Sequence, residues 1–194
     1  MRVELHLAPN DPSLQTLRHA WLAAGTRFAG NTATLAREAR TMHAALSGRD
    51  IPPTLLDALS LVPRVADLIN DPDWALAPEQ RRDFVGALAY FVDNDDLIPD
   101  DIGRYGYLDD AMVLRLAVQS SAQEWNEWND YREFRGTHPE LLGFDRDDWT
   151  RDGQALINAM VKNKNAHRPR ADGDTPFERG YADLSHPAAL FNVR

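Results

Sequence analysis

Apolar residues recur at three- and four-residue spacing along most of this chain, and this helical period constrains the fold more than any other feature of the sequence. The period extends, with interruptions at proline and glycine, from residue 13 to about residue 165. Only residues 2–7 alternate apolar and polar side chains as a strand does, and no second convincing strand segment accompanies them. The sequence therefore predicts an all-α fold with residues 1–12 as a short extended arm.

Proline and glycine divide the periodic region into a single-domain bundle of about six helices. We expect helices near residues 13–25, 32–47, 53–69, 78–92, 108–135 and 145–165. Pro63 should kink or split the third of these, because its ring removes a backbone donor and clashes with the preceding turn. The helical domain then covers residues 13–166, and residues 167–194, rich in Pro, Gly and Asp, form an irregular tail.

Charge and cysteine content exclude several classes of function. Thirty acidic residues against 21 Lys and Arg give a formal net charge of -9, which repels nucleic-acid phosphate and attracts a basic partner. The absence of cysteine excludes disulfides, thiolate nucleophiles and cysteine-based metal sites. With no secretory signal and no apolar run long enough to cross a bilayer, we expect a cytoplasmic protein without a membrane span.

An aspartate-rich segment separates two apolar helical runs at residues 90–111, YFVDNDDLIPDDIGRYGYLDDA. Over residues 84–118 the sequence resembles the YkvA-like family, also called the domain of unknown function 1232. The residues that carry the resemblance are Tyr90, Asp93, Asp96, Leu97, Ile98, Pro99, Asp100, Gly106, Tyr107, Leu108, Asp109, Asp110 and Ala111. The chain departs from the family pattern at Asn94, usually proline, and at Asp95, usually apolar.

The resemblance implies a helical fold, and the family has no established activity to transfer. Many of its members associate with membranes through apolar helices near the motif, and this sequence has no such helix. What the aspartates do must therefore be argued from the residues themselves.

One interpretation gives the aspartates a structural role. Asp96 would cap a short helix with Pro99 in its first turn, while Leu97 and Ile98 enter the core. Gly103 and Gly106 would let the backbone turn back. Asp109 and Asp110 would begin the next helix, where their oxygens accept hydrogen bonds from free amides. We favour this interpretation.

The alternative interpretation is a divalent-cation site. If the glycine turn brings the acidic side chains together, their oxygens would suit Mg²⁺, Mn²⁺ or Ca²⁺. The candidate ligands are Asp93, Asp96, Asp100, Asp109 and Asp110. Such an ion could orient a phosphate or activate water, which would make the protein a metal-dependent helical enzyme, for example a phosphohydrolase.

An aromatic stripe, formed by Trp125, Trp128, Tyr131 and Phe134, repeats every third residue on the fifth predicted helix. Aromatic residues at helical spacing usually pack into a core, and we favour that interpretation. The residues between them are polar, however, and Trp and Tyr are common binding anchors, so the stripe is also our candidate partner surface. The six histidines are scattered without metal-ligand spacing, and SGRD at residues 47–50 predicts only a turn.

Taken together, the residues predict a non-enzymatic helical interaction or regulatory protein. A small acidic chain without a catalytic motif could bind a basic protein partner by charge complementarity, as immunity proteins and antitoxins do. The metal-dependent enzyme is the alternative. The two differ in geometry, because ligands must converge on one point whereas helix caps bond to separate amides.

Overall fold

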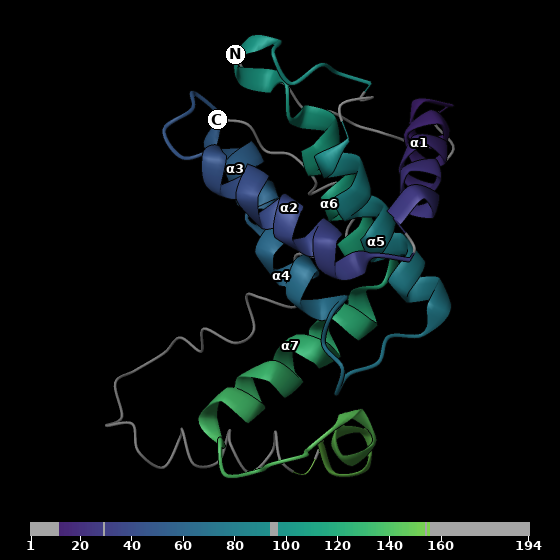
Figure 1. Ribbon diagram of the computed structural model, residues 1–194, viewed down its shortest axis with the longest axis vertical. Coiled ribbons are helices and arrows are strands. Elements are labelled where there is room, and N and C mark those ends of the chain that lie inside the picture. The colour runs from purple at the N-terminus through teal and green to yellow at the C-terminus, as the bar shows by residue number, and fades with distance from the viewer. Residues whose placement is uncertain (1–11, 29, 94–96, 154, 156–194) are drawn as a thin grey trace, which may run out of the picture. The chain divides into compact units, whose positions relative to one another are not determined.

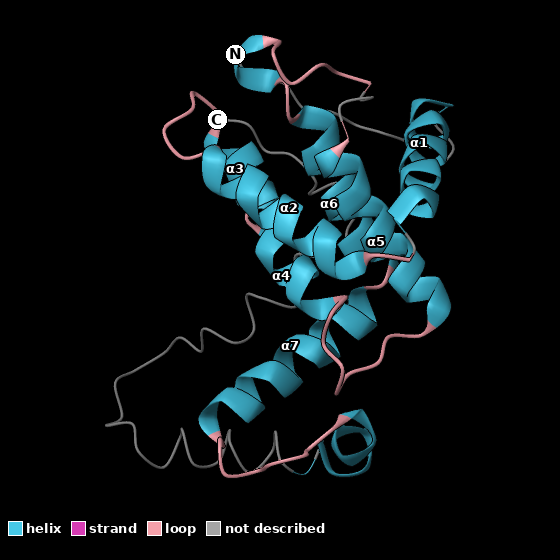
Figure 2. Cartoon of the chain, viewed as in Figure 1, coloured by secondary structure: helices cyan, strands magenta, loops and turns pink. Residues whose placement is uncertain are grey.

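A computed structural model describes residues 12–28, 30–93, 97–153 and 155. These residues form helices joined by turns and loops, with no strand among them (Figure 2). The all-α prediction is therefore confirmed for the described part of the chain. The predicted arm up to residue 11, the tail at 167–194 and the end of the last predicted helix lie outside the described residues.

Contacts between Cα atoms group the chain into two compact units. Among the described residues, those within 12–71 and 76–121 belong to unit 1, and those within 72–75, 122–153 and 155 belong to unit 2. The helices of unit 1 are α1 (Pro12–Phe28), α2 (Thr32–Ala45), α3 (Pro53–Leu59), α4 (Leu61–Leu68), α5 (Pro78–Val92), the 3-10 helix η1 (Gly103–Tyr105) and α6 (Leu108–Ser120). Unit 2 contains α7 (Ala122–Thr137) and a helical segment at 146–153.

Helix α5 is the central element of unit 1. Its residues 84–91 are all buried, and it contacts α1, α2, α4 and α6 (Figure 1). Its approach to α1 depends on Gly86, since a Cβ there would lie 2.4 Å from Cδ1 of Trp21. The Trp21 indole in turn donates a hydrogen bond to the Asp83 carbonyl at 2.8 Å. This tight packing fixes the helix that leads into the aspartate-rich segment.

The third predicted helix is split, as Pro63 indicated. Helix α3 ends at Leu59 and α4 begins at Leu61, which places Pro63 in the first turn of α4, where its missing donor costs little. The bounds of α2 and α5 also agree closely with the predicted ranges.

The prediction of one long helix over 108–135 is wrong. Helix α6 ends at Ser120, Ser121 has non-helical angles of φ -120° and ψ 37°, and α7 begins at Ala122. Serine side chains compete for backbone hydrogen bonds, and the Ser120 hydroxyl donates to the Ala117 carbonyl at 2.9 Å. The break at this serine pair also separates the two compact units along the chain.

Unit 2 has an aromatic core arranged around a buried carboxylate. Tyr131 of α7 packs against Trp74, with ring centroids 4.9 Å apart. One oxygen of Glu124 accepts a hydrogen bond from the Trp74 indole at 2.7 Å, and the other accepts one from Arg146 at 2.8 Å. Because Glu124 is only 5% exposed, these donors replace the water that its charge has lost.

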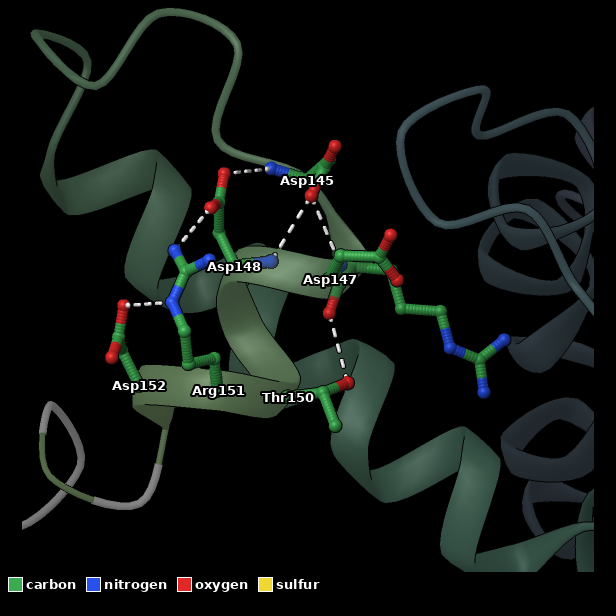
Figure 3. Close-up of polar contacts among 7 residues, drawn as sticks. Asp145, Asp147, Asp148, Thr150, Arg151 and Asp152 are labelled. Carbon is green, nitrogen blue, oxygen red and sulfur yellow. Dashed lines mark hydrogen bonds and ion pairs between the residues drawn. The ribbon is translucent and has the colours of Figure 1, made fainter.

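Aspartates lie at the start of the helical segment at 146–153, which begins close to the predicted residue 145 (Figure 3). Oδ1 of Asp145 accepts hydrogen bonds from the backbone amides of Asp147 and Asp148, at 2.9 and 3.1 Å. Arg151 forms ion pairs with Asp148 and with Asp152. The acidic side chains of this turn therefore serve as a helix cap and as local ion-pair partners.

Candidate functional site

The loop between α5 and α6 is fixed at its start by a buried aspartate. Oδ2 of Asp109 accepts hydrogen bonds from the Tyr90 hydroxyl at 2.7 Å and from the Ile98 amide at 3.0 Å. The Tyr90 oxygen accepts the amide of Leu97 at 3.0 Å. Oδ1 of Asp109 also accepts the amide of Asp110 at 3.2 Å, in the first turn of α6. Asp109 thus connects α5, the loop and α6, and it is 3% exposed.

A second polar cluster fixes the end of the loop. The Tyr107 hydroxyl accepts a hydrogen bond from Arg49 at 2.6 Å and lies near the Asp100 carboxylate. Burial raises the pKa of Asp100, and the interaction with Tyr107 opposes that rise. Burial is also the main cause that raises the pKa of Tyr107, followed by the charge of Asp100.

Gly106 is required by the close approach of two backbone segments at this cluster. A Cβ at position 106 would lie 2.5 Å from the Asp100 carbonyl oxygen and 2.9 Å from its Cα. Gly103 serves differently, since its φ of +56° lies in the left-handed region. Both glycines therefore allow the loop to turn back, as predicted from the sequence.

Two charged residues from the turn between α2 and α3 complete the site. Arg49 reaches Tyr107, and Asp50 lies 3.4 Å from the guanidinium of Arg104 in η1. Sequence reasoning interpreted SGRD only as a turn and missed both residues. Both residues follow Gly48, whose φ is +84°, and this pattern predicts a turn. It does not indicate which loop the two side chains contact.

The side chain of Leu97 lies on the surface, so the prediction that it enters the core is wrong. Its amide and that of Ile98 face inward to Tyr90 and Asp109, and Leu97 is 51% exposed, while Ile98 is half-buried. The short helix expected around Pro99 is also absent. Instead, the chain forms a turn in which the Ile102 amide donates a hydrogen bond to the Pro99 carbonyl at 3.0 Å, and η1 follows.

Three large apolar side chains project from this loop: Leu97, Ile102 at 57% exposure and Tyr105 at 50%. Acidic side chains accompany them, since Asp101 and Asp50 are both exposed. We call the set of Leu97, Ile102, Tyr105, Asp50, Asp101 and Arg104 the motif surface.

The predicted metal ligands that the structure describes have different polar partners, although the charge of Asp109 acts on Asp100. Asp93 pairs with Arg27, Asp100 contacts Tyr107, and Asp109 bonds to Tyr90 and the loop. Asp110 is buried in the first turn of α6, and Asp96 lies outside the described residues. Across the described positions, no three His, Asp or Glu side chains are arranged to hold a metal ion. Binding of Mg²⁺, Mn²⁺ or Ca²⁺ stays a prediction.

The aromatic stripe on α7 is buried. Trp125, Trp128, Tyr131 and Phe134 are at most 5% exposed. Tyr131 and Phe134 pack against Trp149, with ring centroids 6.0 and 5.8 Å apart. These four side chains therefore pack in a core, as the favoured interpretation expected, and none of their rings is exposed in this structure.

Comparison with known proteins finds a similarity that falls on this site. A family model described as "Protein of unknown function (DUF1232)" matches residues 84–116, nearly the segment over which the sequence resembles that family. Searches of curated proteins and of solved structures gave no match. None of the helices in the described ranges is long and apolar enough to span a bilayer.

Proposed function

We propose that this chain is a non-catalytic interaction module that binds a basic protein partner through the motif surface. One observation carries the proposal: Leu97, Ile102 and Tyr105 are each about half exposed or more, on a loop whose backbone is fixed from within. A fixed loop that exposes apolar side chains loses little conformational entropy when it binds.

The buried polar groups of the matched segment support a non-catalytic role. Asp109 and Tyr90 accept hydrogen bonds from the amides at the start of the loop, and Tyr107 accepts one from Arg49 at its end. These groups hold the loop in place, so the side chains available to another molecule are the exposed ones. Leucine, isoleucine and tyrosine offer contact area and aromatic anchoring more than chemical reactivity.

Charge favours a basic partner over a second copy of the chain. Two copies with a formal charge of -9 each repel, whereas a basic protein is attracted. Asp50 and Asp101 are placed beside the apolar side chains, where they would form ion pairs at the rim of an interface. Masking of a basic effector, as immunity proteins and antitoxins do, is one form that such binding can take.

Site-specific photo-crosslinking in the cells of origin tests this proposal. A benzophenone side chain replaces Ile102 or Tyr105, and in the matched control it replaces Leu142, which is 93% exposed in unit 2. We expect one adduct of defined mass at positions 102 and 105, formed with a basic protein and absent at position 142. The yield should fall when extracts are crosslinked at high salt, because salt screens exposed charges.

The proposal is contradicted by equal crosslinking at all three positions, by adducts with lipid or with a second copy only, or by no adduct at 102 and 105.

A further inference from the structure

Arg104 is the only Lys or Arg between residues 93 and 110, and it lies on the motif surface. Its guanidinium nitrogen is 3.4 Å from the Asp50 carboxylate. Its Cζ lies 5.9 Å from the ring centroid of the adjacent Tyr105. A carboxylate and an aromatic ring are the two groups with which proteins most often hold a cationic side chain.

The contact between Arg104 and Asp50 is exposed, and therefore easily exchanged. The Asp50 side chain is 83% exposed and that of Arg104 49%. Ion pairs with this exposure add little to stability, since water and salt compete with them. Arg49 differs, because it bonds to the part-buried Tyr107 hydroxyl at 2.6 Å and belongs to the support of the loop.

Building on the function proposed above, we infer that Arg104 occupies the place of a cationic side chain of the partner and competes with it. In the free protein the Arg104 guanidinium lies beside the Asp50 carboxylate and one face of the Tyr105 ring. A partner arginine or lysine displaces it, while Leu97 and Ile102 contact apolar residues beside that cation. Arg104 thereby lowers the affinity for isolated cations and favours partners that add apolar contacts.

A fluorescein-labelled hexa-arginine peptide, measured by fluorescence anisotropy at low salt, tests this competition without the native partner. Arg104→Gln should tighten binding on the order of threefold to fivefold, the range expected when an exposed ion pair no longer competes. Arg64→Gln is the matched control, because Arg64 is exposed on α4 and its loss changes the net charge equally. The control should change affinity much less.

Removing the acceptors tests the location of the effect. In the Arg104→Gln background, Asp50→Asn and Tyr105→Leu should each reverse the gain. Asp57→Asn should not, although Asp57 is also exposed and paired with an arginine. The inference would be overturned if Arg104→Gln and Arg64→Gln changed the affinity for the peptide equally. It would also be overturned if the affinity gained with Arg104→Gln were unchanged when Asp50→Asn is added.

The outcomes separate this inference from the proposed function. Crosslinking at Ile102 together with an unchanged peptide affinity in Arg104→Gln contradicts the competition alone. Competition observed with the peptide, without any native adduct at Ile102 or Tyr105, contradicts the proposed function alone.

Discussion

Two aspartate-rich segments of this protein, residues 93–110 in unit 1 and 145–152 in unit 2, use the same side chain in opposite ways. In the first, Asp109 is buried and accepts hydrogen bonds from Tyr90 on α5 and from a loop amide. In the second, Asp145 accepts hydrogen bonds only from backbone amides two and three residues ahead of it (Figure 3). The number of acidic residues in a segment therefore does not reveal their role. Their role follows from how far along the chain each carboxylate lies from the groups that donate hydrogen bonds to it.

This difference has energetic consequences. A helix cap replaces water for one or two amides at the surface and contributes about 1 kcal/mol. A buried carboxylate that satisfies donors from several elements cannot be replaced by water when it is removed. Substitutions in the two segments should therefore differ in size, and four of them test the comparison.

The largest effect is expected for Asp109→Ala. Removing the carboxylate leaves the buried Tyr90 hydroxyl and the Ile98 amide without their acceptor, which should lower the free energy of unfolding by about 3 kcal/mol. Urea denaturation followed by far-UV circular dichroism measures this. Asp101→Ala, an exposed aspartate of the same loop, is the control and should stay within about 0.5 kcal/mol of wild type. Equal losses in the two variants would refute the structural role of Asp109.

Gly106→Ala should have the next largest effect. The added Cβ would meet the backbone of Asp100 at 2.5 Å, and displacing a backbone segment should cost about 2 to 3 kcal/mol. Gly143→Ala, in the loop before the second acidic segment, meets no atom within 4 Å but has a φ of +77°, so about 1 kcal/mol is expected there. Thermal unfolding of both variants gives the ranking, and a larger loss at Gly143 would contradict it.

Asp145→Ala should lower stability by about 1 kcal/mol, the usual cost of losing an N-cap. The effect is local, so hydrogen exchange of the Asp147 and Asp148 amides should accelerate while that of the Ile98 amide does not change. Asp152→Ala removes an exposed ion pair with Arg151 and is the control. Unaltered exchange at Asp147 in the Asp145 variant would show that this acid is not the cap.

The smallest effect is a pH dependence at Asp100. Burial raises the pKa of Asp100 in the folded protein above 3.8, so the folded state binds this proton more tightly than the unfolded state. The stability from this group is present below pH 3.8 and is lost as pH rises through the folded-state pKa.

Asp100→Asn, which does not titrate, tests that dependence. The stability of the variant relative to wild type should decrease as pH falls from 7 toward 4, as measured by urea denaturation at each pH. Asp101→Asn is the comparison variant and should keep most of the wild-type trend, because the charge of Asp101 is the smallest of the causes that raise the pKa of Asp100. An opposite slope for Asp100→Asn would mean that Tyr107 and Arg49 outweigh burial at this carboxylate.

Local signals in the sequence predicted most helices of the fold. Pro78 and Glu79 mark the start of α5, and Pro63 marks the break between α3 and α4, because proline acts within its own turn. The break at Ser121 was missed, since the apolar period on either side continues through it and serine disfavours a helix only weakly.

The candidate site was only partly predictable. The position of Asp109 and Asp110 at a helix start follows from sequence, and α6 begins there. Neither the bond from Tyr90 to Asp109 nor the reach of Arg49 to Tyr107 could be predicted, because each joins residues far apart along the chain. Leu97 was misplaced for a different reason: its amide faces the Tyr90 hydroxyl, a side-chain contact that the apolar pattern does not indicate.

Unit 2 depends on four residues that the gene encodes between α4 and α5. Trp74, fully buried, donates its indole proton to Glu124 and packs on Tyr131. A reading frame cut after residue 121 would leave that indole without its acceptor, and a transcript beginning at residue 122 would lack the tryptophan. Unit 2 is therefore discontinuous in sequence, and a gene fragment that encodes only its longer segment lacks one of its core side chains.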